Sequence, residues 1–179
     1  MYCEKLNCIL DNPKSSRFLI DSLTIYKLDS FLKEKVSLVE RKRLNPSKFA
    51  NLMNVEQKTA LMTFVLGVEC NLFKTLAYYD CDCGEGRFIF SMDPFECDCG
   101  KIINPQENRD KIFLYFELLL PLEYCSHENV GLYPIDFIQE NSMDFTLAGV
   151  DEIVGEESAD SMLSLKDRRT QEIKRRLES

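Results

Sequence analysis

Four cysteines with matched spacing are the residues of this sequence best suited to chemistry. The tetrapeptide Cys-Asp-Cys-Gly occurs twice, and its cysteines are Cys81, Cys83, Cys97 and Cys99. Structural zinc usually takes its thiolate ligands in two close pairs on tight turns, because a tetrahedron needs two chain segments to converge. Gly84 and Gly100 directly follow the pairs, and glycine adopts the positive φ that helps such a turn. The spacing predicts one Zn²⁺ bound by these four cysteines.

Two other states of the same cysteines stay open. An iron–sulfur cluster uses the same set of ligands. Disulfides are the other alternative, although cysteines two residues apart bridge each other poorly. Four protein thiolates leave no coordination position for water or substrate, so a zinc ion here would be structural and not catalytic. The ligands have acidic neighbours, which disfavour phosphate and favour a protein contact: Asp82, Glu85, Glu96 and Asp98.

The elements that precede the cysteines follow from spacing and turn residues. Apolar residues from Phe31 to Val39 recur on one face of a helix. Asn45 is a good N-cap and Pro46 suits the first position of the next helix. In order, we expect a helix at 29–44, a short helix from Pro46, a helix at about 56–70, and two paired strands at 72–80 and 87–92.

The second half of the chain has a less distinct pattern. Residues 111–124 are nearly continuously apolar, which is typical of a buried strand or a buried helix, and periodicity does not separate the two. Residues 151–160 are acidic, and an amphipathic basic helix is expected to end the chain.

The order of elements over residues 29–92 resembles a winged helix-turn-helix module, and the cysteine pairs resemble a zinc ribbon with one residue fewer inside each pair. The resemblance implies an α+β fold in three parts: a winged-helix-like unit at 1–80, a zinc ribbon at 81–103, and an α/β C-terminal region at 104–179. Modules resembling these recur together in transcription factors and in accessory subunits of nucleic-acid-handling machines, including prokaryotic defence systems.

The helix that would read DNA in such a module lacks the residues for it. Base readout needs exposed Arg, Lys, Asn or Gln. Gln57 and Lys58 begin this helix, but the residues that follow are apolar on nearly all sides. We expect the helix to be buried. Cationic residues elsewhere are candidate contacts for a partner or for nucleic acid: Arg41, Lys42, Arg43, Lys166, Arg168, Arg169, Lys174, Arg175 and Arg176.

No catalytic constellation is recognisable in the sequence. His127 is the only histidine, and Cys125 lies too near it in sequence for the two to face each other as a catalytic pair. A glycine-rich phosphate loop is missing. Five carboxylates could in principle hold Mg²⁺, but they lie in polar stretches and are expected to face water: Asp144, Asp151, Glu152, Glu156 and Glu157. The sequence therefore predicts a protein that is not an enzyme.

Net charge and the distribution of apolar residues limit the cellular locations and the partners that we expect. The net charge is −8, whereas proteins dedicated to nucleic acid are usually basic. No apolar run approaches the length of a membrane helix, and the charged N-terminal residues do not resemble a signal peptide. We expect a cytoplasmic location, where disulfides are rare.

These observations predict a non-catalytic adaptor or regulatory subunit of a cytosolic multiprotein complex, with a structural zinc site. The alternative is direct binding of DNA or RNA through the basic C-terminal helix.

Overall fold

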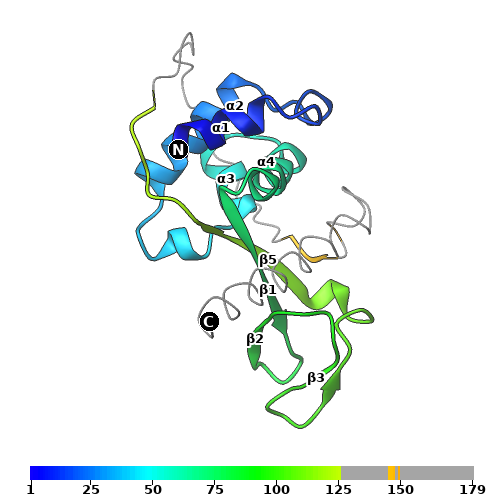
Figure 1. The fold of residues 1–179 in the computed structure, drawn as a ribbon. Coiled ribbons are helices and arrows are strands. Elements are labelled where there is room, and N and C mark those ends of the chain that lie inside the picture. Colours follow the sequence, from blue (N-terminus) through cyan, green and yellow to red (C-terminus); the bar gives the residue numbers. More distant parts are fainter. Residues whose placement is uncertain (126–144, 148, 150–179) are drawn as a thin grey trace, which may run out of the picture. The chain divides into compact units, whose positions relative to one another are not determined.

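The computed structural model describes residues 1–125, 145–147 and 149 of the 179-residue chain. Over these residues it is a mixed α+β protein with four α-helices and small antiparallel sheets (Figure 1). The described residues divide into two compact units. We call residues 1–74 with 116–125 the helical unit, and residues 75–115 with 145–147 and 149 the hairpin unit.

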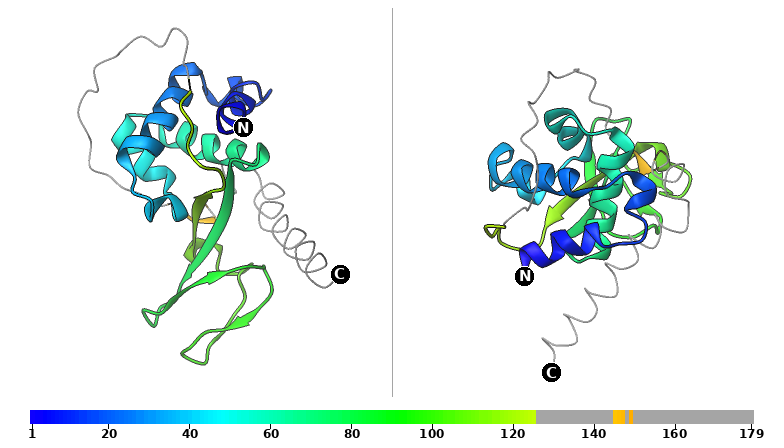
Figure 2. Two further views of the ribbon diagram at one scale, coloured as in Figure 1. Left: turned by 60° about the vertical axis from the view of Figure 1, so that its left-hand side comes forward. Right: turned by 90° about the horizontal axis from the view of Figure 1, so that it is seen from above.

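The helical unit is built around four helices that pack on one another, shown together in Figures 1 and 2. They are α1 (Tyr2–Leu10), α2 (Ser22–Ser30), α3 (Pro46–Met53) and α4 (Gln57–Glu69). Shorter turns are η1 (Ser16–Phe18), the π-helix η2 (Phe31–Lys35) and η3 (Glu40–Lys42). The centre of the core is a cluster of aromatic rings that belong to Phe31, Phe49, Phe64, Phe73 and Phe116.

The two helices that lead into the first strand lie where the sequence predicts them. Asn45 caps α3 by accepting a hydrogen bond from the Ser47 N–H at 2.8 Å, and Pro46 occupies the first helical position. Helix α4 is buried continuously from Thr59 to Gly67. The prediction that this apolar helix belongs to a core is confirmed.

The helix predicted at 29–44 has wrong limits. It starts earlier, as α2, because the Asp21 carboxylate accepts the Thr24 N–H at 2.8 Å and caps it. The helical run ends at η2, and Val36 is extended. Ser37 and Glu40 then exchange backbone and side-chain hydrogen bonds and start η3 as a separate turn.

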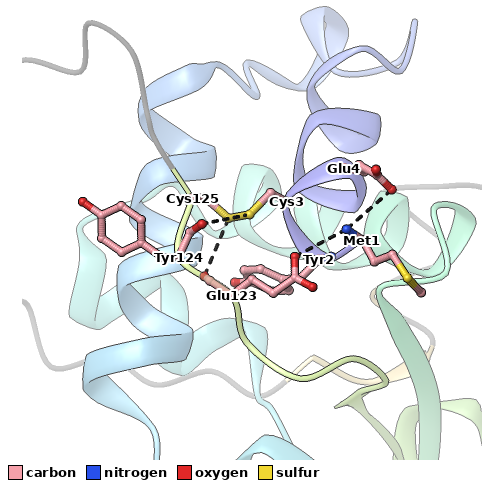
Figure 3. A network of polar contacts seen from close by, with 7 residues as sticks. All are labelled: Met1, Tyr2, Cys3, Glu4, Glu123, Tyr124 and Cys125. Atoms are coloured by element: carbon pink, nitrogen blue, oxygen red, sulfur yellow. Dashed lines mark hydrogen bonds and ion pairs between the residues drawn. A yellow bond between two sulfur atoms is a disulfide. The ribbon is translucent and has the colours of Figure 1, made fainter.

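The remaining four cysteines of the chain form two disulfides in the helical unit. Cys3 pairs with Cys125, and Cys8 pairs with Cys70. Figure 3 shows the first of them beside the start of α1, where the Glu123 carboxylate accepts the Tyr2 N–H at 3.0 Å. The 119–125 segment is thereby attached to α1 by a covalent bond and by hydrogen bonds.

The hairpin unit contains two small antiparallel sheets. The strands are β1 (Phe73–Asp80), β2 (Gly86–Ile89), β3 (Phe95–Glu96), β4 (Ile102–Ile103) and β5 (Ile112–Leu118), with the short turn η4 (Arg109–Lys111) before β5. One sheet has the order β2-β1-β5, and the other pairs β3 with β4. Strands β1 and β5 contain residues of both units.

The predicted strand at 72–80 and its pairing with the next strand are confirmed, with Tyr79 opposite Arg87. The ambiguous apolar segment at 111–124 is resolved in favour of a strand, β5, whose residues alternate between buried and half-buried. The next strand along the chain does not extend this sheet, because Phe95–Glu96 pairs with Ile102–Ile103 instead.

Among the described helices, none combines the length and the apolar character that crossing a membrane requires. The predicted C-terminal helix, with its six basic residues from Lys166 to Arg176, lies outside the described residues.

Candidate metal centre

Each Cys-Asp-Cys-Gly tetrapeptide is the turn of its own β-hairpin. Residues 81–84 lie in the connection between β1 and β2, which is 81–85, and residues 97–100 lie in the connection between β3 and β4, which is 97–101. In the first turn the Gly84 N–H donates to the Cys81 carbonyl at 2.9 Å. In the second, the Gly100 N–H donates to the Cys97 carbonyl at 2.7 Å. The repeated tetrapeptide thus folds into the same turn twice.

The glycines of the two turns are required by backbone conformation and not by space. Gly84 has φ of 84° and Gly100 has φ of 80°, values that side-chain-bearing residues rarely adopt. A Cβ atom at either position would meet nothing within 4 Å. Any other residue would therefore strain the turn that places the two cysteines before it.

The four sulfur atoms converge on one point. They lie within 4.8 Å of one another, with 4.0 Å between Cys81 and Cys99 and 3.8 Å between Cys83 and Cys97. A tetrahedral zinc ion with Zn–S bonds of about 2.3 Å requires sulfurs separated by about 3.8 Å. The arrangement fits a single tetrahedral ion and forms a possible metal site, and it does not identify the metal.

The two turns bury and expose their cysteines in the same pattern. Cys81 and Cys97, the first cysteine of each pair, are buried, whereas Cys83 and Cys99, the second of each pair, are exposed. The site therefore has an inner pair and an outer pair of sulfurs, and each hairpin supplies one sulfur to each.

An aromatic contact joins the two hairpins beside the sulfurs. The Phe95 ring, on β3, and the Tyr79 ring, on β1, form a T-shaped pair with 5.6 Å between centroids. The Arg87 guanidinium lies over the same Phe95 ring at 5.1 Å and donates to the Glu96 carbonyl at 3.0 Å. Because Phe95 precedes Cys97 by two residues, these contacts hold the second turn against the first.

The charge near the sulfurs is less negative than the sequence indicates. Asp82 lies between two cysteines, and its carboxylate is paired with Lys111 at 2.6 Å and Lys101 at 3.7 Å. The hydrogen bond and charge of Lys111 lower the pKa of Asp82, and the carboxylate in turn raises the pKa of Lys111. Sequence reasoning did not pick out either lysine. The position of Lys101 directly after the second glycine weakly indicates that it lies near the cysteines, whereas nothing in the sequence places Lys111 there.

The thiols interact strongly with one another. The Cys83 backbone N–H, followed by the Cys83 thiol, lowers the pKa of Cys81 to about 7. The Glu85 backbone N–H lowers the pKa of Cys83, but the thiol of Cys81 and partial burial outweigh it and raise that pKa to about 12. Such opposed shifts are expected when several thiols share a small volume, because one thiolate disfavours the next.

One buried polar group next to the site has no hydrogen-bond partner among the described residues. The hydroxyl of Tyr79 is buried and unpaired. Burial and the nearby Cys81 raise its pKa. The charge of Lys111 opposes this rise in pKa, and Asp82 and Cys97 add to it.

The other predicted site residues do not gather around a common site in the described part of the chain. Arg41 donates its Nε–H to the Leu32 carbonyl at 3.1 Å, while Lys42 and Arg43 are exposed on and after η3. The predicted contacts from Lys166 to Arg176 lie outside the described residues, as do His127 and the five carboxylates considered for Mg²⁺.

Comparison with known proteins adds no relative. No family model matches this chain, and no curated protein or solved structure is significantly similar to it.

Proposed function

We propose that this chain is a non-catalytic adaptor or regulatory subunit of a multiprotein complex, with a hairpin unit held in shape by structural zinc. The observation that carries the proposal is the combination found in the two hairpins. Their turns supply four thiol ligands for one ion, and their flanks expose large apolar side chains. Phe90 is 59% exposed and Ile102 is 76% exposed.

Zinc is the metal that we favour for the site. An ion held by four thiolates has no open coordination position, so it organises the fold without taking part in a reaction. An iron–sulfur cluster places several irons and sulfides between its cysteines. Sulfurs within 4.8 Å of one another leave room for a single ion and not for such a cluster.

The metal part of the proposal is tested by elemental analysis of the purified full chain, with Cys97→Ser as the test variant and Asp98→Asn as its matched control. We expect one zinc per chain in the wild type and the control, none in Cys97→Ser, and no visible absorption band. A coloured, iron-containing protein would show that the cysteines hold a cluster and not zinc. A wild-type protein that folds stably without any metal would refute the proposed metal site.

The exposed apolar side chains support a protein partner. A solvent-exposed Phe or Ile is ordinary when single, but two on the hairpins of a non-catalytic metal centre are suited to a covered surface. We extend the proposal to the modules that the chain resembles: α3, α4, β1 and β2 follow the order of a winged helix-turn-helix, and the hairpins follow that of a zinc ribbon. On that reading the partner belongs to a nucleic-acid-handling or defence complex.

The partner is tested by capture from native cells with tagged full chain, with and without nuclease. The double variant Phe90→Ser/Ile102→Ser is compared with Leu38→Ser, whose side chain is 74% exposed in the helical unit. We expect a stoichiometric partner that survives nuclease, is retained by Leu38→Ser and is lost by the double variant. Loss of all partners on nuclease treatment would favour the alternative, direct nucleic-acid binding through the basic C-terminal residues.

The cytoplasmic location stays a prediction, and the disulfides weigh against it. Disulfides persist mainly in oxidising compartments. The test is to trap free thiols in freshly lysed cells with an alkylating reagent. Free Cys3, Cys8, Cys70 and Cys125 are expected if the chain works in the cytoplasm, and unreactive ones contradict that location.

A further inference from the structure

The chain contains two groups of cysteines in different states. Four of them are paired in disulfides, all in the helical unit. The other four are free thiols, all in the hairpin unit. A chain whose disulfides have formed has met an oxidant, so its free thiols have been exposed to the same chemistry. Their fate under oxidation depends on which sulfurs can reach each other.

Two sulfur–sulfur contacts in the cluster run from one hairpin to the other. Cys81 lies 4.0 Å from Cys99, and Cys83 lies 3.8 Å from Cys97. Cysteines within one turn are two residues apart and bridge poorly, because a disulfide needs Cα atoms about 5.5 Å apart with Cβ atoms directed toward each other. Both contacts therefore favour crosslinks from one hairpin to the other.

Each of these two contacts joins one inner and one outer sulfur. Cys81 and Cys97 are buried, and Cys83 and Cys99 are exposed. In each contact the exposed sulfur is thus accessible to a dissolved oxidant, and a buried sulfur lies next to it to complete the bond. A pairing of Cys83 with Cys99 would use both accessible sulfurs together and leave the two buried ones with no accessible partner.

We propose that the four-cysteine centre is a site of oxidative modification by hydroperoxides, which converts it into two specific disulfides, Cys81–Cys99 and Cys83–Cys97, and releases the metal. The inference rests on the proposed metal site for its starting state. The final pairing rests on the two sulfur contacts and on the exposure of one sulfur in each.

The chemistry balances with hydrogen peroxide as the oxidant. An outer thiolate attacks the peroxide, the O–O bond breaks, and a sulfenic acid and hydroxide form. The neighbouring inner thiolate then attacks the sulfenic sulfur, the S–S bond forms, and a second hydroxide leaves. Each disulfide gives two electrons to one peroxide. Four zinc-bound thiolates and two peroxides thus yield two disulfides, four hydroxides and a free Zn²⁺.

Crosslinks between hairpins also preserve the fold of the unit after the metal has left. Each predicted disulfide ties the turn at 81–84 to the turn at 97–100, which is the connection that the metal makes. The Phe95 contact with Tyr79 and Arg87 keeps the two turns adjacent while the bonds form. Oxidation therefore exchanges one kind of crosslink for another at the same place.

The experiment titrates zinc-loaded full chain with hydrogen peroxide and measures free zinc with a colorimetric indicator. A protease that cuts before aspartate then separates Cys81 from Cys83 at Asp82, and Cys97 from Cys99 at Asp98. Mass spectrometry of the unreduced peptides assigns the pairing. We expect one zinc released per two peroxides, with Cys81 linked to Cys99 and Cys83 linked to Cys97.

Single variants supply a matched pair of controls. Cys99→Ser is expected to form only the Cys83–Cys97 disulfide, and Cys97→Ser only the Cys81–Cys99 disulfide, while the two disulfides of the helical unit stay in place. Pairing within a turn, pairing of Cys81 with Cys97, or oxidation to sulfonic acids without disulfides would overturn the proposal.

A metal-free arm separates this inference from the proposed function. Wild-type chain that carries no zinc is oxidised in the same way, and its disulfides are mapped. If the wild type does not bind added zinc but still forms the predicted disulfides, the modification site stands and the metal site is refuted. Zinc that stays bound after excess peroxide would refute the modification and leave the metal site intact.

Discussion

Replacing Phe64 tests whether α4 is the centre of a core and not a surface that reads DNA. The Phe64 ring is fully buried and meets three other rings, with centroids 4.8 Å from Phe73, 5.2 Å from Phe116 and 5.8 Å from Phe49. Truncation to alanine removes the ring and leaves a cavity among rigid neighbours that cannot close it. Such substitutions cost about 3–5 kcal/mol.

The three ring contacts place Phe64→Ala in the upper half of that range, at about 4–5 kcal/mol, because aromatic pairs contribute beyond their buried area. In a chain of this length 1 kcal/mol lowers Tm by about 2–4 °C, so we expect a fall of about 8–20 °C. Phe64→Leu keeps most of the volume but loses the ring contacts, and is expected to cost about 1–2 kcal/mol.

The assay is urea unfolding followed by the helical circular dichroism signal, with disulfides intact. That signal reports on the helical unit, which contains α1 to α4. The control is Leu38→Ala in the same unit. Its side chain is 74% exposed, and it is expected to change the free energy of unfolding by less than about 0.5 kcal/mol. A cost for Phe64→Ala below about 1 kcal/mol, or equal to that of the control, would refute the core assignment.

Three further predictions concern single features of the structure. The double variant Cys8→Ser/Cys70→Ser opens a loop of sequence separation 62 and should lower the free energy of unfolding by about 4 kcal/mol by loop-closure entropy; an unchanged urea midpoint would contradict the bond. Burial and the nearby Asp29 raise the pKa of Tyr2 above its ordinary value, so above about pH 10 the unfolded chain loses a proton that the folded chain keeps. Stability should therefore fall with rising pH by up to about 1.4 kcal/mol per unit, and Tyr2→Phe should reduce that slope by one proton in urea titrations from pH 9 to 11. The buried hydroxyl of Tyr79 has no partner among the described residues, and leaving such a group unpaired costs about 1–3 kcal/mol. Tyr79→Phe should raise the Tm of metal-free protein, and a lower Tm would show that the hydroxyl is bonded.

The candidate metal ligands could be identified from the sequence because their signal is local. The repeated tetrapeptide fixes ligand type, spacing and the glycine that turns the chain, and all three are properties of neighbouring residues. The start of α3 was predictable for the same reason, since Asn45 and Pro46 act within one turn of helix. Patterns of this kind need no knowledge of the rest of the fold.

Features that depend on distant residues were not predictable in this way. The pairing of β3 with β4 is decided by which strand lies alongside, and both strands are only two residues long. The choice of strand over helix at 112–118 depends on β1 as a partner. The ion pairs of Asp82 with Lys101 and Lys111 likewise join parts of the chain that no spacing rule connects.

The limits of the helices were not predictable for a different reason. Helix α1 contributes only Tyr2, Leu6 and Ile9 to the core, which is too short a pattern to recognise by periodicity. The apolar residues from Phe31 to Val39 suggested a continuous helix, but the helical run ends at Lys35, and the hydrogen bonds of Ser37 and Glu40 begin a new turn. Competition between side-chain and backbone hydrogen bonds is not visible in apolar spacing.

The disulfide between Cys3 and Cys125, with a sequence separation of 122, closes most of the chain into a covalent ring. A single proteolytic cut anywhere inside the ring, for example beside the exposed Leu38, cannot release a fragment until a reductant opens the disulfide. Without reductant, single cuts can shorten the polypeptide only outside residues 3–125. A nicked molecule therefore keeps its hairpins and its helices on one covalent body, and the cut becomes visible on a gel only after reduction.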